Sequence, residues 1–252
     1  MDSSCPLCGQ ENEEFLKLHY SKYSVNLPFY GQITFFLLGS IGLVVAQFLV
    51  MSFFVIFKGG NEFTDSDQGL MIYFTYILLF VIFAVLIFIF RKKFTIFFKH
   101  WPAYIAGLIG FMAIFAFSFI LSLLVKNVNE NEQAVRTYTT MFPVLSIIVL
   151  GILGPVCEEL TYRVGLFSFF RRINRILAYV VSTIVFALIH FNFQTDPEAL
   201  LIELQNLPFY LFAGFAFSYL YDRYGFAASL TAHILNNLVS VTLSIIGAII
   251  GG

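Results

Sequence analysis

Residues 141–163 read MFPVLSIIVLGILGPVCEELTYR, and this stretch decides the fold. Its first part, from Met141 to Val156, is apolar and long enough to enter a bilayer, and two carboxylates, Glu158 and Glu159, follow almost at once. Because a charge near the middle of a membrane helix costs at least about 3 kcal/mol, such residues usually face a polar cavity or a partner and mark a functional site. The stretch therefore predicts a membrane helix that carries a functional site.

The composition of the whole chain agrees with this prediction. The 252 residues are 59% hydrophobic and only 12% charged, and the mean hydropathy is +0.86. Helix surfaces that face lipid must be as apolar as a core, so the composition predicts an all-α, polytopic helical bundle in a membrane. A net charge of -1 and a pI near 6.4 give no concentrated basic face, which argues against nucleic acid as a partner.

Apolar runs of roughly 20 residues predict about seven to eight transmembrane helices. The seven expected spans are residues 33–57, 70–90, 101–125, 140–170, 176–190, 207–221 and 226–250. The fourth is too long for one straight span, which indicates a tilted helix or a break near Gly154-Pro155. The amphipathic stretch from Glu198 to Asn206 leaves room for an eighth helix, on the surface or re-entrant. The first span is expected to be an uncleaved anchor, because the residues before it lack the features of a signal peptide.

Basic residues indicate how the chain is oriented. We expect a cytosolic tail over residues 1–30 and a membrane domain over residues 31–252. The tail and alternate loops carry ten basic residues: Lys17, Lys22, Arg91, Lys92, Lys93, Lys99, Arg171, Arg172, Arg175 and Arg223. The other loops carry three: Lys58, Lys126 and Arg136. The positive-inside rule then predicts a multi-pass protein of the cell membrane with its N-terminus in the cytosol and its C-terminus outside.

Four polar residues in the apolar spans are predicted to share one depth. If the fourth and fifth spans are antiparallel, Glu158 and His190 each lie roughly 22 to 26 Å from their common turn, at 1.5 Å per residue. His233 and Asn237 lie roughly 13 to 20 Å beyond the turn before the last span, by the same rise. We therefore expect all four side chains in one pocket below the cytosolic surface.

Helical spacing suggests what this pocket can do. Glu159 and Arg163 are four residues apart and can form an ion pair within the helix. Glu158 is turned about 100° away and is free to face the pocket. His233 and Asn237 are also four residues apart and present two hydrogen-bond donors. A carboxylate and a histidine on facing helices can polarise a water, and two further donors can stabilise an oxyanion, which suffices to hydrolyse an amide.

The motifs Glu158-Glu159-x-x-x-Arg163, Phe186-x-x-x-His190 and His233-x-x-x-Asn237 resemble those of a known family. This is the CPBP or Abi family of CAAX-protease and bacteriocin-processing membrane endopeptidases. The resemblance covers the region 139–250 and leaves the tail and the first three spans unexplained. It implies an all-helical intramembrane endopeptidase that cleaves a membrane-bound or lipidated peptide within the lipid bilayer. The implied catalytic residues are Glu158 and His190, which activate water, and His233 and Asn237, which bind the oxyanion, with Glu159 and Arg163 in support.

Metal dependence is left open by the residues. No His-Glu-x-x-His helix is present, and one glutamate with two histidines can hold either zinc or a water. We favour a site without a cofactor and keep zinc as the alternative. In the tail, Cys5 and Cys8 have the spacing of half a zinc ribbon, but a structural site needs four ligands, so His19 or a second chain would have to complete it. Cys157 is expected to be a small apolar packing residue.

Other functions and other roles fit the same residues. A catalytically dispensable scaffold or regulator would have the same fold. A proton-coupled carrier would use Glu158 and His190 as a relay, but carriers usually show repeated halves, and the sequence shows none. Glu159 and Arg163 could form a purely structural ion pair. Asn237 could act as a hydrogen-bonded contact between helices.

Overall fold

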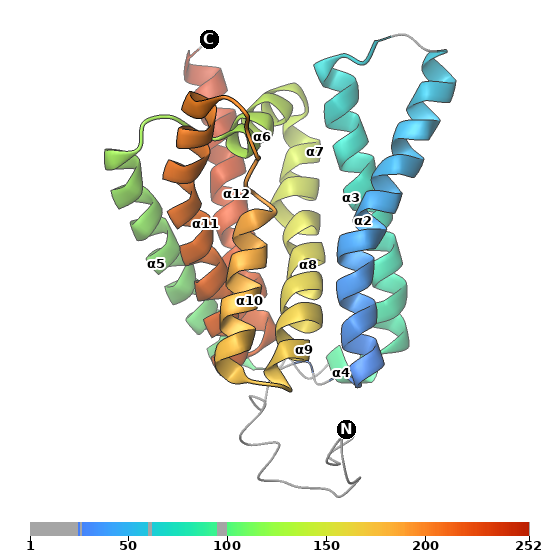
Figure 1. The fold of residues 1–252 in the computed structure, drawn as a ribbon, viewed down its shortest axis with the longest axis vertical. Coiled ribbons are helices and arrows are strands. Elements are labelled where there is room, and N and C mark those ends of the chain that lie inside the picture. Colours follow the sequence, from blue (N-terminus) through green and yellow to red (C-terminus); the bar gives the residue numbers. More distant parts are fainter. Residues whose placement is uncertain (1–24, 26, 60–61, 95–99, 252) are drawn as a thin grey trace, which may run out of the picture.

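The computed structural model describes residue 25 and residues 27–59, 62–94 and 100–251 (Figure 1). Every regular element in these ranges is a helix, which confirms the all-α class. The cysteine pair Cys5 and Cys8 lies outside the described residues, and so does His19.

Six helices in the described ranges are long and apolar enough to cross a membrane. They are α2 (Phe29–Lys58), α3 (Asp65–Ile89), α5 (Trp101–Leu124), a compound helix over Pro143–Arg171, α11 (Pro197–Tyr224) and α12 (Phe226–Gly251). Three shorter helices that matter for the site are α4 (Arg91–Phe94), α6 (Glu130–Met141) and α10 (Arg175–Leu188). The polytopic bundle is therefore confirmed, whereas the predicted count of seven to eight spans is not.

The difference in count comes from the fifth predicted span. It corresponds to α10, which has 14 residues and is therefore about 21 Å long, shorter than the roughly 30 Å hydrocarbon core of a bilayer. The stretch from Glu198 to Asn206, a candidate eighth helix, forms the first turns of α11 instead.

The compound helix does not break at Gly154-Pro155 but widens. It runs as α7 (Pro143–Ile148), a first π-helical segment (Val149–Leu153), α8 (Gly154–Glu159), a second π-helical segment (Leu160–Phe167) and α9 (Ser168–Arg171). Pro155 has no N–H, and the N–H of Gly154 donates to the carbonyl of Val149, five residues earlier. The chain thus passes the proline by adding a residue to one turn, and such π turns are frequent at functional sites.

The helix α2 packs closely on the second π segment. A Cβ atom on Gly39 would lie 1.7 Å from Oγ1 of Thr161, and one on Gly165 would lie 2.6 Å from the backbone nitrogen of Phe36. Glycine at these two positions lets the helices approach where any side chain would clash. The first membrane helix, which the motifs left unexplained, therefore supports the helix that carries the glutamates.

The helix α6 was not predicted. The side chain of Asn129 caps it by accepting the N–H of Glu132 at 3.1 Å, and Glu130 and Glu132 stand in its first turn. These signals precede a polar helix rather than an apolar run, so a search for membrane spans passes over them. Figure 1 places α6 at the end of the bundle that holds the C-terminus, opposite α4 and α9.

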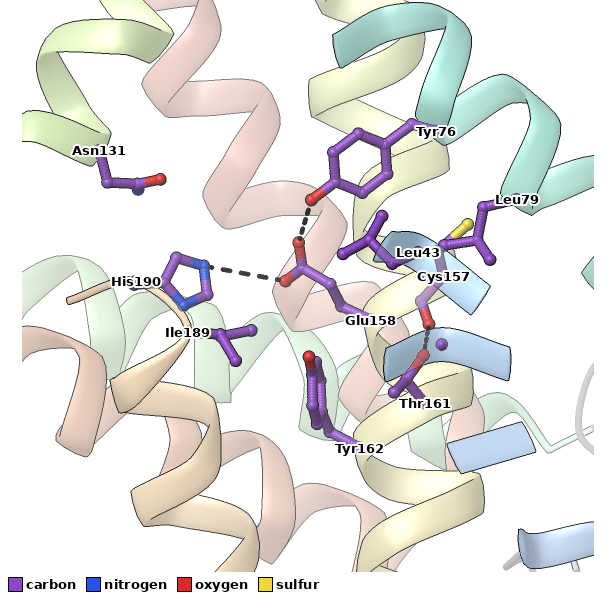
Figure 2. A pocket seen from close by; sticks show the side chains of 11 residues that line it. Leu43, Tyr76, Leu79, Asn131, Cys157, Glu158, Thr161, Tyr162, Ile189 and His190 are labelled. Atoms are coloured by element: carbon purple, nitrogen blue, oxygen red, sulfur yellow. Dashed lines mark hydrogen bonds and ion pairs between the residues drawn. The ribbon is translucent and has the colours of Figure 1, made fainter. Parts of the chain in front are cut away.

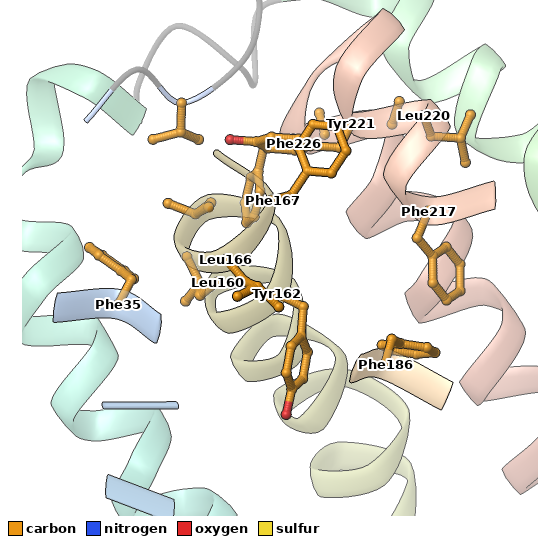
Figure 3. Packing of buried hydrophobic residues seen from close by; sticks show 14 of the residues in the cluster. Phe35, Leu160, Tyr162, Leu166, Phe167, Phe186, Phe217, Leu220, Tyr221 and Phe226 are labelled. Carbon is orange, nitrogen blue, oxygen red and sulfur yellow. The ribbon is translucent and has the colours of Figure 1, made fainter. Parts of the chain in front are cut away.

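The basic residues gather at the other end of the bundle. Helix α4, the turn between α9 and α10, and the turn between α11 and α12 all lie there, beside the start of α2 (Figure 1). Asp222 is buried among them and binds Arg171 at 3.1 Å, Arg175 at 2.6 Å and the hydroxyl of Tyr179 at 2.9 Å. Large aromatic side chains pack in the core next to this end of the bundle (Figure 3), and the ring centres of Phe167 and Tyr221 lie 5.8 Å apart.

Candidate active site

Glu158 stands where three helices meet. One of its oxygens, Oε2, lies 3.5 Å from Nε2 of His233 on α12 and 4.0 Å from Nε2 of His190, which follows α10. The other oxygen, Oε1, accepts the hydroxyl of Tyr76 on α3 at 3.4 Å (Figure 2). The structure thus brings together three of the four predicted catalytic residues. It adds Tyr76, which nothing in the apolar pattern of its span distinguishes.

The imidazole of His190 is held by the backbone carbonyl of Phe186 and by the ring of Tyr210. Its Nδ1 atom lies 2.8 Å from the carbonyl oxygen of Phe186, so Nδ1–H donates and Nε2 is directed to Glu158. The imidazole stacks on Tyr210 of α11, with ring centres 4.7 Å apart and planes 16° apart. The spacing of Phe186 and His190 therefore has a structural reason, because the first residue fixes the tautomer of the second.

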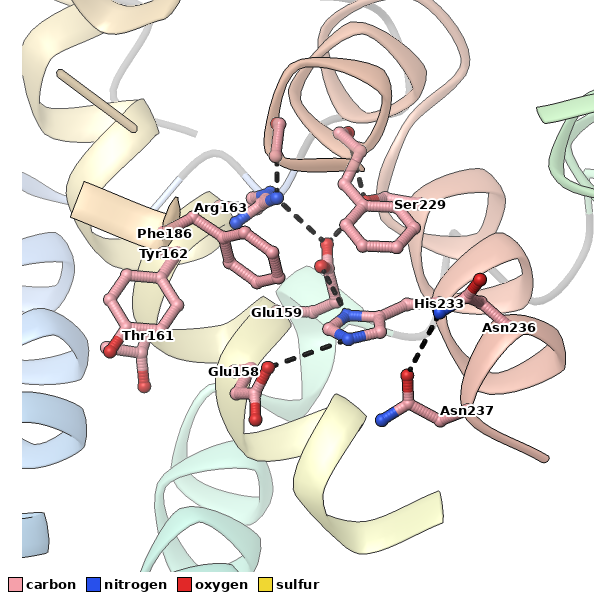
Figure 4. A network of polar contacts seen from close by, with 12 residues as sticks. Glu158, Glu159, Thr161, Tyr162, Arg163, Phe186, Ser229, His233, Asn236 and Asn237 are labelled. Carbon is pink, nitrogen blue, oxygen red and sulfur yellow. Dashed lines mark hydrogen bonds and ion pairs between the residues drawn. The ribbon is translucent and has the colours of Figure 1, made fainter. Parts of the chain in front are cut away.

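His233 bridges the two adjacent carboxylates (Figure 4). Its Nδ1 atom lies 2.9 Å from Oε1 of Glu159, while its Nε2 atom faces Glu158. The ring is 2% exposed and stacks on Phe217 at 4.3 Å. The sequence predicted that His233 and Glu158 share a pocket, but the bond to Glu159 was not expected.

Glu159 is completely buried and has three partners. Its Oε2 atom lies 3.7 Å from Nε of Arg163, so the predicted pair within the helix is present. The hydroxyl of Ser229 on α12 donates to the same oxygen. Ser229 lies four residues before His233 on the same helical face, and this spacing could have indicated it. Arg163 also donates to the carbonyl of Gly214 at 3.2 Å, and its guanidinium lies 4.6 Å above the ring of Phe186.

Asn237 binds the helix backbone rather than Glu158. Its Nδ2 atom donates to the carbonyl oxygen of Leu150 at 3.1 Å, in the first π segment. The usual backbone donors for this carbonyl are not available, because Gly154 donates to Val149 and Pro155 has no N–H. Asn237 therefore satisfies an acceptor that the proline leaves without a partner.

The two imidazoles direct their Nε2 atoms at Glu158. Both Nδ1–H groups are already bound, so Nε2 of the neutral His190 ring is an acceptor, whereas Nε2 of His233 is an acceptor when that ring is neutral and a donor when it is protonated. Oε2 of Glu158 is buried and has no hydrogen-bond partner among the described residues. Oε2 of Glu158 and Nε2 of His190 are then two acceptors that require a donor between them, and a water molecule, which has two hydrogens to donate, fits this arrangement.

A cavity of about 120 Å³ adjoins Glu158 and His190 (Figure 2). Its other lining residues come from five parts of the chain, namely Gly39, Leu43, Tyr76, Leu79, Asn131, Cys157, Thr161, Tyr162 and Ile189. The helices α2 and α3 form one wall and α6 contributes Asn131. Cys157 is a free, buried thiol beside the cavity.

The described residues give no positive support for a metal ion. Zinc takes imidazole nitrogen and carboxylate oxygen at about 2.0 to 2.2 Å. In the described part of the chain, no group of three or more His, Cys, Asp or Glu side chains is arranged to hold an ion. The zinc alternative depends on the chemistry of Glu158, His190 and His233 alone.

The part of the chain that carries this geometry is similar to one family model and to two curated proteins. Residues 140–239 match the family model described as "Type II CAAX prenyl endopeptidase Rce1-like". A 96-residue segment is 31% identical to a Bacillus subtilis protein named "Putative membrane peptidase YdiL", covering 38% of this chain and 34% of that protein. A 70-residue segment is 36% identical to the "UPF0177 protein in abiGi 5'region" of Lactococcus lactis, covering 28% of each. No solved structure gives a significant match.

The matches define the segment for which similarity is shown. Residues 140–239 include all three motifs, so the resemblance found in the sequence is confirmed for this segment. The matched segments span about a third of the length of the two curated relatives. The chain is thus a polytopic membrane protein with an Rce1-like segment, and α2, α3 and α5 lie outside the residues that the family model matches.

Proposed function

We propose that the chain is an intramembrane endopeptidase that hydrolyses a peptide bond in a membrane-associated or lipidated protein or peptide. The observation that carries this proposal is the convergence of Glu158 with the Nε2 atoms of His190 and His233 beside a cavity. The match of this segment to the Rce1-like model supports the same reaction class. A buried carboxylate with two imidazoles is suited to general acid–base work.

Glu158 and His190 activate the water in this proposal. The water donates one hydrogen to Glu158 and one to Nε2 of His190, which directs its oxygen to the carbonyl carbon of the substrate. As the new C–O bond forms, Glu158 takes the proton and the electron pair of the C=O bond moves onto the carbonyl oxygen. Glu158 then passes the proton to the amide nitrogen, and the C–N bond breaks to give a carboxyl group and an amine.

His233 stabilises the negative charge on the carbonyl oxygen. It can donate from Nε2 only if both ring nitrogens carry hydrogen, because Nδ1–H is bound to Glu159. A proton on His233 also balances the buried charges, since Glu158 and Glu159 carry two negative charges and Arg163 carries one positive charge. Glu159 and Arg163 thus support the reaction through His233, and removing such an oxyanion donor typically costs about 100- to 1000-fold in rate.

Asn237 contributes a second donor in this proposal. One of its two amide hydrogens is bound to Leu150, and the other remains for the oxyanion. We therefore expect a smaller loss from Asn237→Ala than from Glu158→Ala.

The experiment that tests the proposal compares Glu158→Gln with the unchanged protein. Membrane peptides from cells that express either form are identified by mass spectrometry, and candidate peptides are then offered to the purified proteins in liposomes. Glu198→Gln, an exposed carboxylate on α11, is the matched control. Near-normal cleavage by purified Glu158→Gln protein would end the assignment. A scaffold or regulator of the same fold would keep its cellular role in this variant.

A further inference from the structure

The chain leaves the helical state just before His190. Helix α10 ends at Leu188, and residues 191–196 then run without regular structure toward the end of the bundle that holds α6, where α11 begins (Figure 1). Irregular backbone at membrane depth is tolerated only where protein buries it or where it lines a cavity that contains water. The path from His190 to the α6 end is therefore the place to look for polar groups.

Polar groups do line this path. Glu203 of α11 is 2% exposed and accepts the backbone N–H groups of Glu130 at 2.9 Å and Asn192 at 3.2 Å. The side chain of Asn129 donates to the carbonyl of His190 at 3.3 Å. Polar contacts thus extend without interruption from the catalytic histidine to the first turn of α6.

The cavity beside Glu158 reaches the same polar region. Asn131 of α6 lines it together with Glu158 and His190. The side chain of Asn131 donates to the hydroxyl of Tyr210 at 3.2 Å, and Tyr210 is the ring on which His190 stacks. The cavity therefore extends from Glu158 to the first turn of α6, at the α6 end of the bundle.

In the opposite direction the site is closed by packed side chains. Arg163, Val164 and Phe167 have exposed fractions of 0%, 0% and 1%. Tyr221 packs on Phe167 (Figure 3), and the buried Asp222 ion-pair cluster lies next to Tyr221 at the basic end of the bundle. Among the residues that the structure describes, these buried side chains close the path from the site to the basic end.

The two ends of the bundle also differ in charge. Of the basic residues described at the loops, seven lie at the closed end: Arg91, Lys92, Lys93, Arg171, Arg172, Arg175 and Arg223. The end that bears α6 carries acidic residues, among them Asp65, Asp67, Glu130 and Glu132. By the positive-inside rule the closed end faces the cytosol and the open end faces away from it.

We infer that the catalytic cavity opens on the non-cytosolic face of the membrane, and that the substrate is a peptide segment of a membrane-anchored or exported protein presented on that face. The part of this inference that names a substrate rests on the proposed function. The side of the membrane on which the cavity opens can be measured without any cleavage. Water reaches Glu158 by the same route, past Asn131 and His190.

The experiment labels single cysteines in intact cells with a maleimide that cannot cross the membrane. The parent protein carries Cys5→Ser and Cys8→Ser, and the buried Cys157 gives the background. Asn131→Cys reports on the α6 end of the cavity and Lys92→Cys, on α4, on the closed end. We expect Asn131→Cys to react in intact cells, in samples where a cytosolic marker protein stays unlabelled. We expect Lys92→Cys to react only after the cells are permeabilised.

A second arm links the opening to activity. Ile189 is 47% exposed and lines the cavity, so the same reagent added outside should block peptide cleavage by Ile189→Cys by at least about 10-fold. Reaction of Lys92→Cys in intact cells, or no reaction of Asn131→Cys, would overturn the inference. If the cysteines react as expected while no peptide is cleaved by the untreated protein, the proposed function fails and the direction of the opening stands.

Discussion

The side-chain amide of Asn237 donates to the carbonyl oxygen of Leu150 at 3.1 Å, across the gap between α12 and the first π segment. Leu150 is the residue whose carbonyl would otherwise be paired with residue 155, and Pro155 cannot donate. The third motif is therefore coupled to the proline just before Cys157-Glu158-Glu159. Asn237 helps to fix the helix that presents the carboxylate of Glu158, in addition to the oxyanion role proposed for it.

We expect Asn237→Ala to lower the free energy of unfolding by about 1 to 3 kcal/mol, because the carbonyl of Leu150 is left without a partner. The measurement is thermal unfolding in detergent. Pro155→Ala supplies an N–H five residues after Leu150, so the double variant should recover most of the lost stability. If it does not, the bond to Leu150 has no structural importance. Cleavage that recovers together with stability would assign Asn237 to positioning rather than to the oxyanion.

Single substitutions of Glu158, His190 and His233 should each remove nearly all cleavage. Because the three act on one transition state, the loss in a double variant should be far smaller than the product of the single losses. Initial rates with one fluorogenic peptide check this, with Glu198→Gln as the control. Losses that multiply would mean that the three residues act independently.

Glu159→Gln should be strongly destabilising. It leaves Arg163 with no carboxylate partner at a position where both side chains are fully buried, and breaking such a pair costs about 3 to 5 kcal/mol. The chain offers a matched control, since Glu132 and Arg136 form a pair with the same spacing on exposed α6. Glu132→Gln should change the free energy of unfolding by about 0.5 kcal/mol or less. Equal effects of the two substitutions would show that burial does not determine the importance of Glu159.

Glu203→Ala should lower the rate constant of cleavage by roughly 10- to 100-fold, because it releases the backbone of Asn192 next to His190 and small displacements at a reacting centre are costly. Glu203 touches no reacting atom, so KM should stay nearly constant while kcat falls. Glu203→Gln keeps an acceptor and should recover part of the rate. A rise in KM with unchanged kcat would contradict this positioning role.

Cleavage should survive prolonged treatment with a strong chelator if Glu158 activates water without a metal. A catalytic metal that is removed takes the activated water with it. Loss of activity that stoichiometric zinc restores would show that the metal-free prediction is wrong. The same assay on protein with Cys5→Ser and Cys8→Ser would tell whether the tail is the source of the effect.

The sequence was informative about the polar residues in the membrane because burial of such groups is costly. Glu158, His190 and His233 stand out from apolar surroundings, and counting residues from the turns placed them at compatible depths. The prediction used only the length of each helix and the residue spacing along it. These are the properties that a helix keeps whatever it packs against.

The remaining features depend on how helices rotate and tilt against one another. The bond from His233 to Glu159 requires one particular rotation of α12, and Tyr76 reaches Glu158 only because α3 packs where it does. Glu203 belongs to the amphipathic stretch that the sequence assigned to a possible surface or re-entrant helix, yet it is buried in α11. Its backbone partners lie in segments far away in the chain, and hydropathy cannot identify them.

The first π segment also determines which way Glu158 points. It accommodates one residue more than an α-helical turn would, between Val149 and Leu153. Deleting a single residue there would let the turn close as an ordinary α-helix and rotate Glu158 by about 100° relative to α7. Such a chain would still insert and pack its apolar helices, but it would have lost its chemistry. A one-residue gap before the paired glutamates would therefore distinguish an inactive descendant of this protein from an active one.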